Sequence, residues 1–467
     1  MVQGSSLIRP RTVTGDGVGL VSHAGVAWLA ETADASGLTA GLTAAMTSVP
    51  QRRHDPGRTL AQMILALADG ATCLSDIAAL RAQPAMFGAV ASDATVWRTF
   101  DQIGSVELRG VATARAAARA RAWAAGAGPA GDDLVIDFDA TLINTKADKQ
   151  DARPNYKRGY GHHPLLAMIA ETDEVLAGIL RPGNAGSNTA IDHVTVLGDA
   201  LAQLPAEWQA GHQVGDDADD VVHRVLIRAD AGGASHWFAE ECVERNLEFS
   251  FGFHIDHRVR DGVMCVPTGC WHHAVDTNAT RRDGAEVVEI TDFVDLTAWP
   301  EDTRLIVRRE RPHPGAQLSL FDTIEGFRHT AFITNQRGYD VAALELQQRQ
   351  RARAENVIRD TKACGLANLP FDDVVSNEVW MNLCFAANDL LGWAQRIGCT
   401  GQLRRATPKT IRHRMLHIAA RITPNSRSLR LDHDWPWTKL VIDAIGRVRT
   451  AFQALTVTAA PTAQAAL

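Results

Sequence analysis

The stretch "DLVIDFDA", residues 133–140, decides the fold expected of this chain of 467 residues. It predicts a buried strand, and two further apolar runs, "PLLAMIAE" (164–171) and "EVLAGILR" (174–181), follow closely enough to pair with it as an antiparallel meander. The first strand ends with Asp137 and Asp139, which stand two residues apart and therefore share one face. Two acids there are costly unless a cation neutralises them, although one of them could simply hydrogen-bond the loop that follows.

The residues after this meander alternate between helix and strand. We expect a helix from Ser187, a strand "VVHRVLIRAD" ending at Asp230, a helix capped by Ser235 and a strand "LEFSFGFHI". With short, right-handed connections, the fourth strand can return parallel beside the first. That return would bring Asp230 next to the strand end that carries Asp139. A plain turn residue before two glycines remains an alternative for Asp230.

A third acid stands among arginines in "QQRQRARAENVIRDTK", residues 347–362. Asp340 can cap and Gly365 can end one helix around it. That helix would align five polar side chains: Gln348, Arg351, Glu355, Arg359 and Lys362. Two interpretations stay open. The helix is either a solvated surface laced with ion pairs, or the carrier of a metal-binding carboxylate whose neighbouring cations grip a phosphate chain.

The remaining sequence suggests five parts. Residues 1–128 are expected to form a helical N-terminal domain, which is either a helix-turn-helix reader with exposed arginines that binds DNA ends or a plain helical bundle. Residues 129–255 and 336–400 form the two halves of an α/β core, separated by a β-rich insertion at 256–335. Residues 401–467 form a basic helical segment with a disordered tail. From 401 to 450 there are eleven Lys and Arg against three Asp.

Composition excludes several classes of protein. A net charge of −7 argues against one large nucleic-acid surface, and the chain has neither an apolar run long enough for a membrane span nor a signal core, so we expect a cytoplasmic protein. Seven scattered cysteines do not form a disulfide framework. In "CVPTGCWHH" (265–273) the spacing of two cysteines and two adjacent histidines is poor for zinc.

These motifs resemble the bacterial insertion-sequence transposases of the DDE type, which have an RNase H-like core, and most closely the thirteen-eighty family. The resemblance covers nearly the whole chain, through "GATCLSDIAALRAQPAMFGAVASDATVWRTFD", "IDFDATLINT", "KRGYGHHPLLAMIAE", "LIRADAGGAS" and the Glu355 helix, in that order. The family's helix signature is Tyr-x2-Arg-x3-Glu-x6-Lys. Arg351, Glu355 and Lys362 match it, whereas Gln348 stands in place of the tyrosine. The family's Asp-x-Thr element falls on Asp139 and Thr141.

The resemblance implies a fold, a site and a reaction. The fold would be a mixed sheet, with three antiparallel strands followed by parallel strands and flanking helices. Asp139, Asp230 and Glu355 would be catalytic and would hold two Mg²⁺ ions, for which Mn²⁺ can substitute, with Asp137 as the alternative to Asp139. The DNA-binding residues would be Gln348, Arg351 and Lys362. The enzyme would cut the strand at the element's end, and the freed 3′ hydroxyl would attack target DNA.

The implied partners are double-stranded DNA, as terminal inverted repeats and as target, and a second subunit in a homodimeric synaptic complex at the nucleoid, with no membrane. Lys157 and Arg158, with His162, lie in "NYKRGYGHH" between the first two strands and are further candidates for DNA contact, although a solvated loop would look the same. Trp271 is either a core residue or an aromatic that stacks on a displaced base. A nuclease that does not join, and a silent DNA-binding relic, remain alternative functions.

Overall fold

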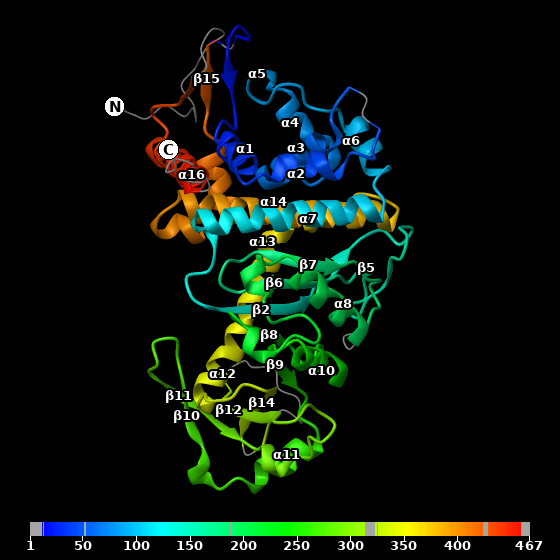
Figure 1. Ribbon diagram of the computed structural model, residues 1–467, viewed down its shortest axis with the longest axis vertical. Helices are drawn as coiled ribbons and strands as arrows, with labels where there is room; N and C mark the ends of the chain where they lie inside the picture. The colour runs from blue at the N-terminus through cyan, green and yellow to red at the C-terminus, as the bar shows by residue number, and fades with distance from the viewer. Residues whose placement is uncertain are drawn as a thin grey trace, which may run out of the picture.

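The architecture was established from a computed structural model, which describes residues 12, 14–50, 53–186, 189–312, 323–324, 326–423 and 428–458. The fold is α/β, with one large mixed sheet and flanking helices, as the sequence predicts. From top to bottom in Figure 1, N-terminal and C-terminal helices lie above the long helices α7 (Ser105–Ala122) and α14 (Val374–Gly398), and the core sheet lies below these. The strands that follow residue 256 form the lower end.

The core elements lie close to their predicted positions. Strands β2, β6, β7, β8 and β9 alternate with helices α8 and α10 as expected, and Ser235 caps α10 by accepting a hydrogen bond from Phe238 N. The predicted start of α8 at Ser187 lies outside the described residues. The bounds are β2 (Asp133–Ala140), β6 (Leu165–Ile169), β7 (Val175–Ile179), α8 (Ala190–Leu201), α9 (Ala206–Gln209), β8 (Arg224–Ala229), α10 (His236–Glu244) and β9 (Glu248–Phe253).

The pairing of these strands follows from their alternation and short connections. Strand β2 pairs antiparallel with β6, and β6 with β7, which is the predicted meander. Strand β8 returns parallel to β2, and β9 lies parallel to β8. The carboxyl ends of β2 and β8 therefore meet at one edge of the core.

Residues 256–335 extend the same sheet. Strand β14 pairs antiparallel with β9, so the sheet runs in the order β10-β11-β12-β14-β9-β8-β2-β6-β7, with β13 beside β14. The sequence predicted that this region is rich in strands, but it did not predict the helix α11. The bounds are α11 (His257–Cys265), β10 (His272–Val275), β11 (Arg281–Glu289), β12 (Arg304–Glu310), β13 (Thr323–Ile324) and β14 (Phe327–Thr334).

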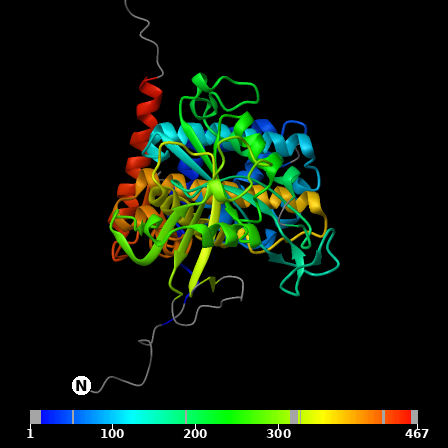
Figure 2. The same ribbon diagram turned by 90° about the horizontal axis from the view of Figure 1, so that it is seen from below.

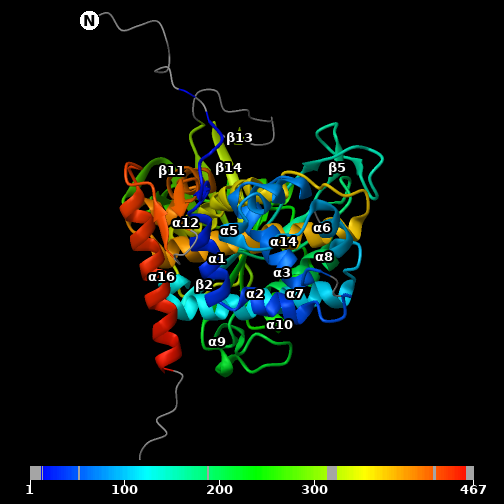
Figure 3. The same ribbon diagram turned by 90° about the horizontal axis from the view of Figure 1, so that it is seen from above.

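A small separate sheet interrupts the chain between β2 and β6, where the sequence suggested only a loop. It consists of β3 (Ile143–Asn144), β5 (Tyr160–His162) and β4 (Arg153–Pro154), in that order. It projects from the side of the molecule opposite the C-terminal helix α16 (Thr438–Thr458; Figures 2 and 3).

The N-terminal residues are mainly helical, as predicted. Helix α3 ends at Gly70, whose φ of 115° supplies the left-handed turn. Cys73 caps the next helical turn, where the carboxylate of Asp76 accepts hydrogen bonds from Thr72 N and Cys73 N. The bounds are β1 (Leu20–Val21), α1 (Val26–Ala35), α2 (Leu38–Ala45), α3 (Pro56–Asp69), η1 (Leu74–Ile77), α4 (Ala78–Arg81), α5 (Pro84–Phe87), α6 (Asp93–Phe100), α7 (Ser105–Ala122) and a π turn η2 (Trp123–Ala127).

The C-terminal segment is not wholly helical. Strands β15 and β16 form a three-stranded sheet with β1, from the other end of the chain. Helix α16 packs against α1 and α14 and runs along one side of the molecule (Figure 3). It continues to Thr458, so the expected tail beyond it lies outside the described residues. The bounds are α14 (Val374–Gly398), η8 (Gly401–Arg405), α15 (Pro408–Ile411), η9 (Arg412–Leu416), β15 (Ala420–Ile422), β16 (Leu429–Leu431) and α16 (Thr438–Thr458).

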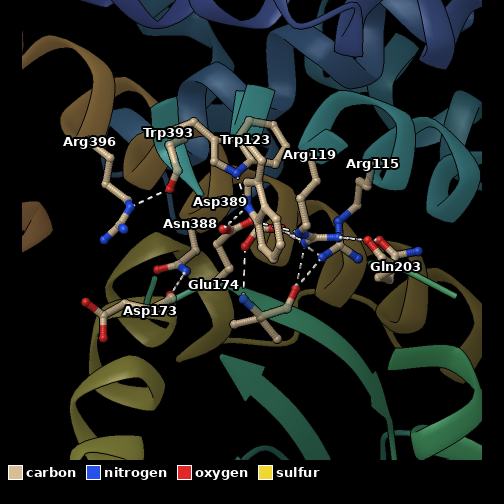
Figure 4. A network of polar contacts seen from close by, with 12 residues as sticks. Arg115, Arg119, Trp123, Asp173, Glu174, Gln203, Asn388, Asp389, Trp393 and Arg396 are labelled. Carbon is tan, nitrogen blue, oxygen red and sulfur yellow. Dashed lines mark hydrogen bonds and ion pairs between the residues drawn. The ribbon is translucent and has the colours of Figure 1, made fainter. Parts of the chain in front are cut away.

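A buried polar network joins α7, β7 and α14 (Figure 4). Arg115 and Arg119 of α7 both donate to Oδ2 of Asp389 on α14, at 3.0 and 2.7 Å. Arg119 Nε also donates to Glu174 at 2.7 Å. The arginines of α7 that we expected on an exposed face thus include two that are at most 1% exposed. They face inward because two acids neutralise them there.

Within the described residues, no single helix is long and apolar enough to cross a membrane, although the bent pair Pro56–Asp69 and Leu74–Arg81 passes that test by length and composition.

Candidate active site

Asp139 stands at the end of β2, opposite Leu166 of β6. One of its carboxylate oxygens, Oδ1, accepts a hydrogen bond from Ala140 N at 2.8 Å, and its side chain is 17% exposed. The strand therefore presents this carboxylate at the rim of the sheet, where a ligand can reach it.

Asp230 directly follows β8 and lies beside the end of β2, because Phe138 is in register with Ala229. Its Oδ1 accepts hydrogen bonds from Gly232 N and Gly233 N at 2.9 and 3.2 Å. Such a side-chain turn is the alternative that the sequence left open for this residue. The turn engages only one oxygen, so it fixes the carboxylate without excluding a ligand.

Glu355 lies on a helical segment that the sequence predicted as one helix between Asp340 and Gly365. Asp340 does cap it, accepting from Ala343 N at 2.8 Å, and Gly365 does end it, with a φ of 106°. Between them the helix tightens into a 3-10 turn, and it ends in a π turn. The bounds are α12 (Val341–Arg349), η6 (Gln350–Arg353), α13 (Ala354–Thr361) and η7 (Lys362–Leu366). The tightened turn shifts the register just before Glu355.

The three acids share one electrostatic environment. Burial raises the pKa of the Asp139 carboxyl, and the negative charges of Asp230 and Glu355 raise it further, against the opposing charge of Arg351. The structure thus places Asp230 and Glu355 near enough to Asp139 for their charges to act on its carboxyl, although the three carboxylates do not all have oxygens within 4.8 Å of one another. Carboxylates that repel one another at a strand edge fit a divalent cation, because oxygen ligands and excess negative charge are what Mg²⁺ binds.

The side chain of Arg351 points at the acids rather than along its own helix. Its Nη1 lies 3.4 Å from Oδ2 of Asp139. Arg359 pairs with Asp360 and receives no contact from Glu355. Glu355 itself is exposed and makes no hydrogen bond or ion pair with any residue that the structure describes. A surface helix laced with ion pairs around Glu355 is therefore not what the chain forms.

Asp137 is engaged elsewhere. It lies opposite Arg228 of β8, and the two side chains form a bidentate ion pair with both distances at 2.8 Å. Both residues are 1% exposed. Because both oxygens of Asp137 are taken, it is a poor alternative to Asp139 as a metal ligand. Arg228 also donates to Gln347 O, so it ties α12 to the two central strands.

Gln348 and Lys362 contact the strand ends. The amide of Gln348 accepts from Ser250 Oγ at 2.8 Å and donates to Ala229 O at 3.2 Å. Both ends of that amide are therefore occupied inside the protein, and the DNA contact expected of Gln348 stays a prediction. Lys362 Nζ donates to Thr141 Oγ1 at 2.7 Å and Leu142 O at 3.0 Å. One of its three N–H donors remains for a ligand.

Lys157 and Arg158 lie in the exposed turn between β4 and β5. Burial lowers the pKa of Lys362, and the charge of Lys157 lowers it further. His162, by contrast, is fully buried and bonds Gln150 O at 3.0 Å, so it does not reach the surface. His162 is buried because it is the last residue of the strand β5.

Trp271 and the cysteine motif beside it do not form a ligand site. Trp271 is 8% exposed and Arg309 lies over its ring at 4.0 Å, so it is a packed residue and not a free stacking platform. The residues Cys265, Cys270, His272 and His273 do not converge into a metal-binding group; among the described residues the one such group lies elsewhere, at His23, Asp69 and His417.

One comparison with known proteins matches a family. A family model described as transposase DDE domain group 1 matches residues 7–453. No curated protein matches the chain. Among solved structures, the chain is similar to a piggyBac transposase synaptic complex with hairpin DNA, determined by cryo-EM. The TM-score is 0.43 at 10% sequence identity, and the match covers 93% of this chain and 83% of that chain.

Proposed function

The chain belongs to the family of DDE transposases of domain group 1, and from this premise we propose that it moves its element by cut-and-paste transposition. It would cut DNA at the ends of an insertion sequence and join the freed ends to target DNA. We further propose membership of the thirteen-eighty family of insertion sequences, on the match of Arg351, Glu355 and Lys362 to that family's helix signature.

One observation carries this proposal. Asp139 ends β2, Asp230 directly follows β8 beside it, and the guanidinium of Arg351 lies next to Asp139. Burial raises the pKa of Asp139, and the charges of Asp230 and of Glu355 on the neighbouring helix raise it further. We propose that these three carboxylates hold two divalent cations, Mg²⁺ or in its place Mn²⁺. Two such ions supply stabilisation of the attacking and leaving oxygens of an in-line phosphoryl transfer.

The cations around the acids have separate tasks in this proposal. Arg351 limits the repulsion at Asp139 and orients that carboxylate. Lys362 fastens the loop after β2 to the Glu355 helix and offers its remaining donor to a DNA phosphate. Lys157 and Arg158, in the turn of the small sheet, extend this positive surface outward. Gln348 acts as a positioning residue, because it holds the ends of β8 and β9 together.

We propose that the substrates are the element's terminal inverted repeats and target DNA at the nucleoid, and that two copies of the chain bridge two ends. The experiment uses DNA fragments carrying the element's own ends, with Mg²⁺, and measures binding, cleavage and joining. Wild type should do all three. Asp230→Asn and Glu355→Gln should bind but cut at least about 1000-fold more slowly, as expected when charge stabilisation at the reacting phosphate is lost.

A matched control is Asp219→Asn, which removes an exposed carboxylate just before β8 and should cut normally. Cleavage without joining by wild type would indicate a nuclease. Binding without cleavage by wild type would indicate a silent DNA-binding relic. Equal cleavage by wild type and both variants would remove the three acids from the reaction.

A further inference from the structure

A second polar cluster lies outside the carboxylate site and uses both ends of the chain. Nδ1 of His23 lies 2.5 Å from Oδ2 of Asp69, and Nε2 of His417 lies 3.1 Å from Oδ1 of the same carboxylate. One ligand atom from each residue lies within 4.8 Å of the other two. Neither DNA cleavage nor the carboxylate site uses these residues.

The fold builds this cluster from three distant segments. Strand β1 pairs with β15, and the ladder continues as Ala24 N donates to Ile418 O and Gly25 N to Leu416 O, at 2.9 and 3.1 Å. The two histidines are therefore held across from each other, and their rings stack with centroids 4.0 Å apart. Asp69 is the last residue of α3, immediately before Gly70.

The backbone at His23 supports a directed role for this side chain. Its φ is 53°, a left-handed conformation that few residues other than glycine adopt. Such conformations cost free energy and are enriched at binding sites, so this one is consistent with a ligand at the imidazole of His23.

The neighbouring cation does not neutralise the carboxylate. Arg412 donates to Ala68 O at 2.8 Å and to Leu67 O at 3.2 Å, which are carbonyls at the end of α3. The carboxylate of Asp69, whose side chain is only 6% exposed, is thus left to the two histidines. The histidine side chains are 33% and 36% exposed, so one side of the cluster is open to solvent.

We propose that His23, Asp69 and His417 bind a divalent transition metal of the zinc class. Two imidazole nitrogens and one carboxylate oxygen are a donor set that such ions prefer, and the open side leaves a fourth position for water. Mg²⁺ favours oxygen ligands, so the two sites differ in the ion they select. The bound ion fastens the N-terminal strand and α3 to the C-terminal segment, and it stabilises the assembled fold.

The test uses the full chain, stripped of metal with a chelator, with Cys265 and Cys270 replaced by serine because both thiols are exposed. The carboxylate site is disabled with Asp230→Asn and Glu355→Gln. Zn²⁺ is titrated against a chromophoric chelator, and Co²⁺ absorption reports the coordination. We expect one Zn²⁺ per chain, a tetrahedral Co²⁺ spectrum and a rise in Tm on adding Zn²⁺.

Asp69→Asn and His417→Gln should weaken Zn²⁺ binding by more than about tenfold and abolish the rise in Tm. His433→Gln, which changes a fully exposed histidine, should leave both unchanged. The comparison of Tm with and without Zn²⁺ within each variant remains decisive even if a variant is less stable. If all variants bind Zn²⁺ like the parent, or if the parent binds none, the three residues only form structural hydrogen bonds and the proposal is overturned.

Discussion

Gly252 is a single residue that controls where Asp230 lies. It sits on β9 opposite Phe332, and a methyl group at its Cα would meet Ala231 N at 2.6 Å and Asp230 C at 3.0 Å. Those atoms are backbone and cannot move aside cheaply, so Gly252→Ala should displace the loop that carries Asp230. We expect DNA cleavage to fall about 10- to 100-fold, because a shift of about 1 Å at a catalytic group costs this much. Steady-state cleavage rates measure it.

Gly198→Ala is the matched control for that substitution. Gly198 lies on α8, and nothing stands within 4 Å of the position that a Cβ would take. Alanine there should leave cleavage unchanged and stabilise the fold by about 0.5–1 kcal/mol, because glycine is unfavourable inside a helix. Normal cleavage by Gly252→Ala would mean that the Asp230 loop tolerates the shift.

The carboxylate of Asp139 should lower the stability of the metal-free fold, although the proposed function requires it. Its pKa is raised by burial first and then by the charges of Asp230 and Glu355. A raised folded-state pKa means that this carboxyl favours folding at low pH and opposes folding once pH rises through the folded pKa. At pH 7 without metal, Asp139→Asn should therefore have a higher Tm than wild type. The difference should shrink as pH falls through the folded-state pKa of Asp139 and should be lost below the unfolded value of about 3.9.

Thermal unfolding in a chelating buffer, at a series of pH values, measures this effect. Asp219→Asn again serves as the control, because its carboxylate is exposed and lies outside the cluster. A lower Tm for Asp139→Asn at pH 7 would mean that the ion pair with Arg351 outweighs the cost of burial and repulsion.

At the scale of elements, Asp389 joins three of them. It accepts from Arg115 and Arg119 of α7 and from Val175 N of β7, at 3.0, 2.7 and 3.0 Å. Asp389→Ala would leave two buried guanidinium groups with less compensation. We expect a loss of about 3–5 kcal/mol in the free energy of unfolding, measured by denaturant titration. Arg109→Ala, at an exposed position of the same α7, should change it by no more than about 0.5 kcal/mol. If the two substitutions changed the free energy of unfolding equally, the buried network would not be a main source of stability.

Elements whose signals are local were predictable from sequence. Strand β2 appears at its predicted residues, and the caps at Ser235 and Asp340 act as expected, because each depends on a few neighbouring residues. The meeting of Asp139 and Asp230 was also predictable, since it needs only a parallel return with short connections. The 3-10 turn before Glu355 was not predicted from the sequence.

Features that depend on partners far along the chain were not predictable. Strand β15 exists because β1 pairs with it about 400 residues away in sequence, and its own residues are too few to signal a strand. The inward arginines of α7 depend on Glu174 and Asp389, which sequence does not bring to them. The ion pair between Asp137 and Arg228 depends on the register of β2 and β8, and a shift of that register by one residue would break it.

At the scale of the whole molecule, the two ends of the chain support each other. Helix α16 packs against α1 and α14, and Val441, one of its buried residues, is fully excluded from solvent. Arg449 of α16 also pairs with Glu31 of α1 at 2.6 Å. Unfolding of α16 should therefore expose α1 as well, although more than 400 residues separate the two helices.

Val441→Asp tests this coupling, because it places an unpaired charge between α16 and the helices beneath it. We expect a loss of at least about 3 kcal/mol and faster amide hydrogen exchange in both α16 and α1. Ile442→Asp makes the same chemical change one residue later, at a side chain that is 56% exposed, and should alter stability by no more than about 0.5 kcal/mol. Faster exchange confined to α16 would contradict the coupling. Faster exchange in both helices, slowed again by Zn²⁺, would connect this coupling to the cluster of His23, Asp69 and His417.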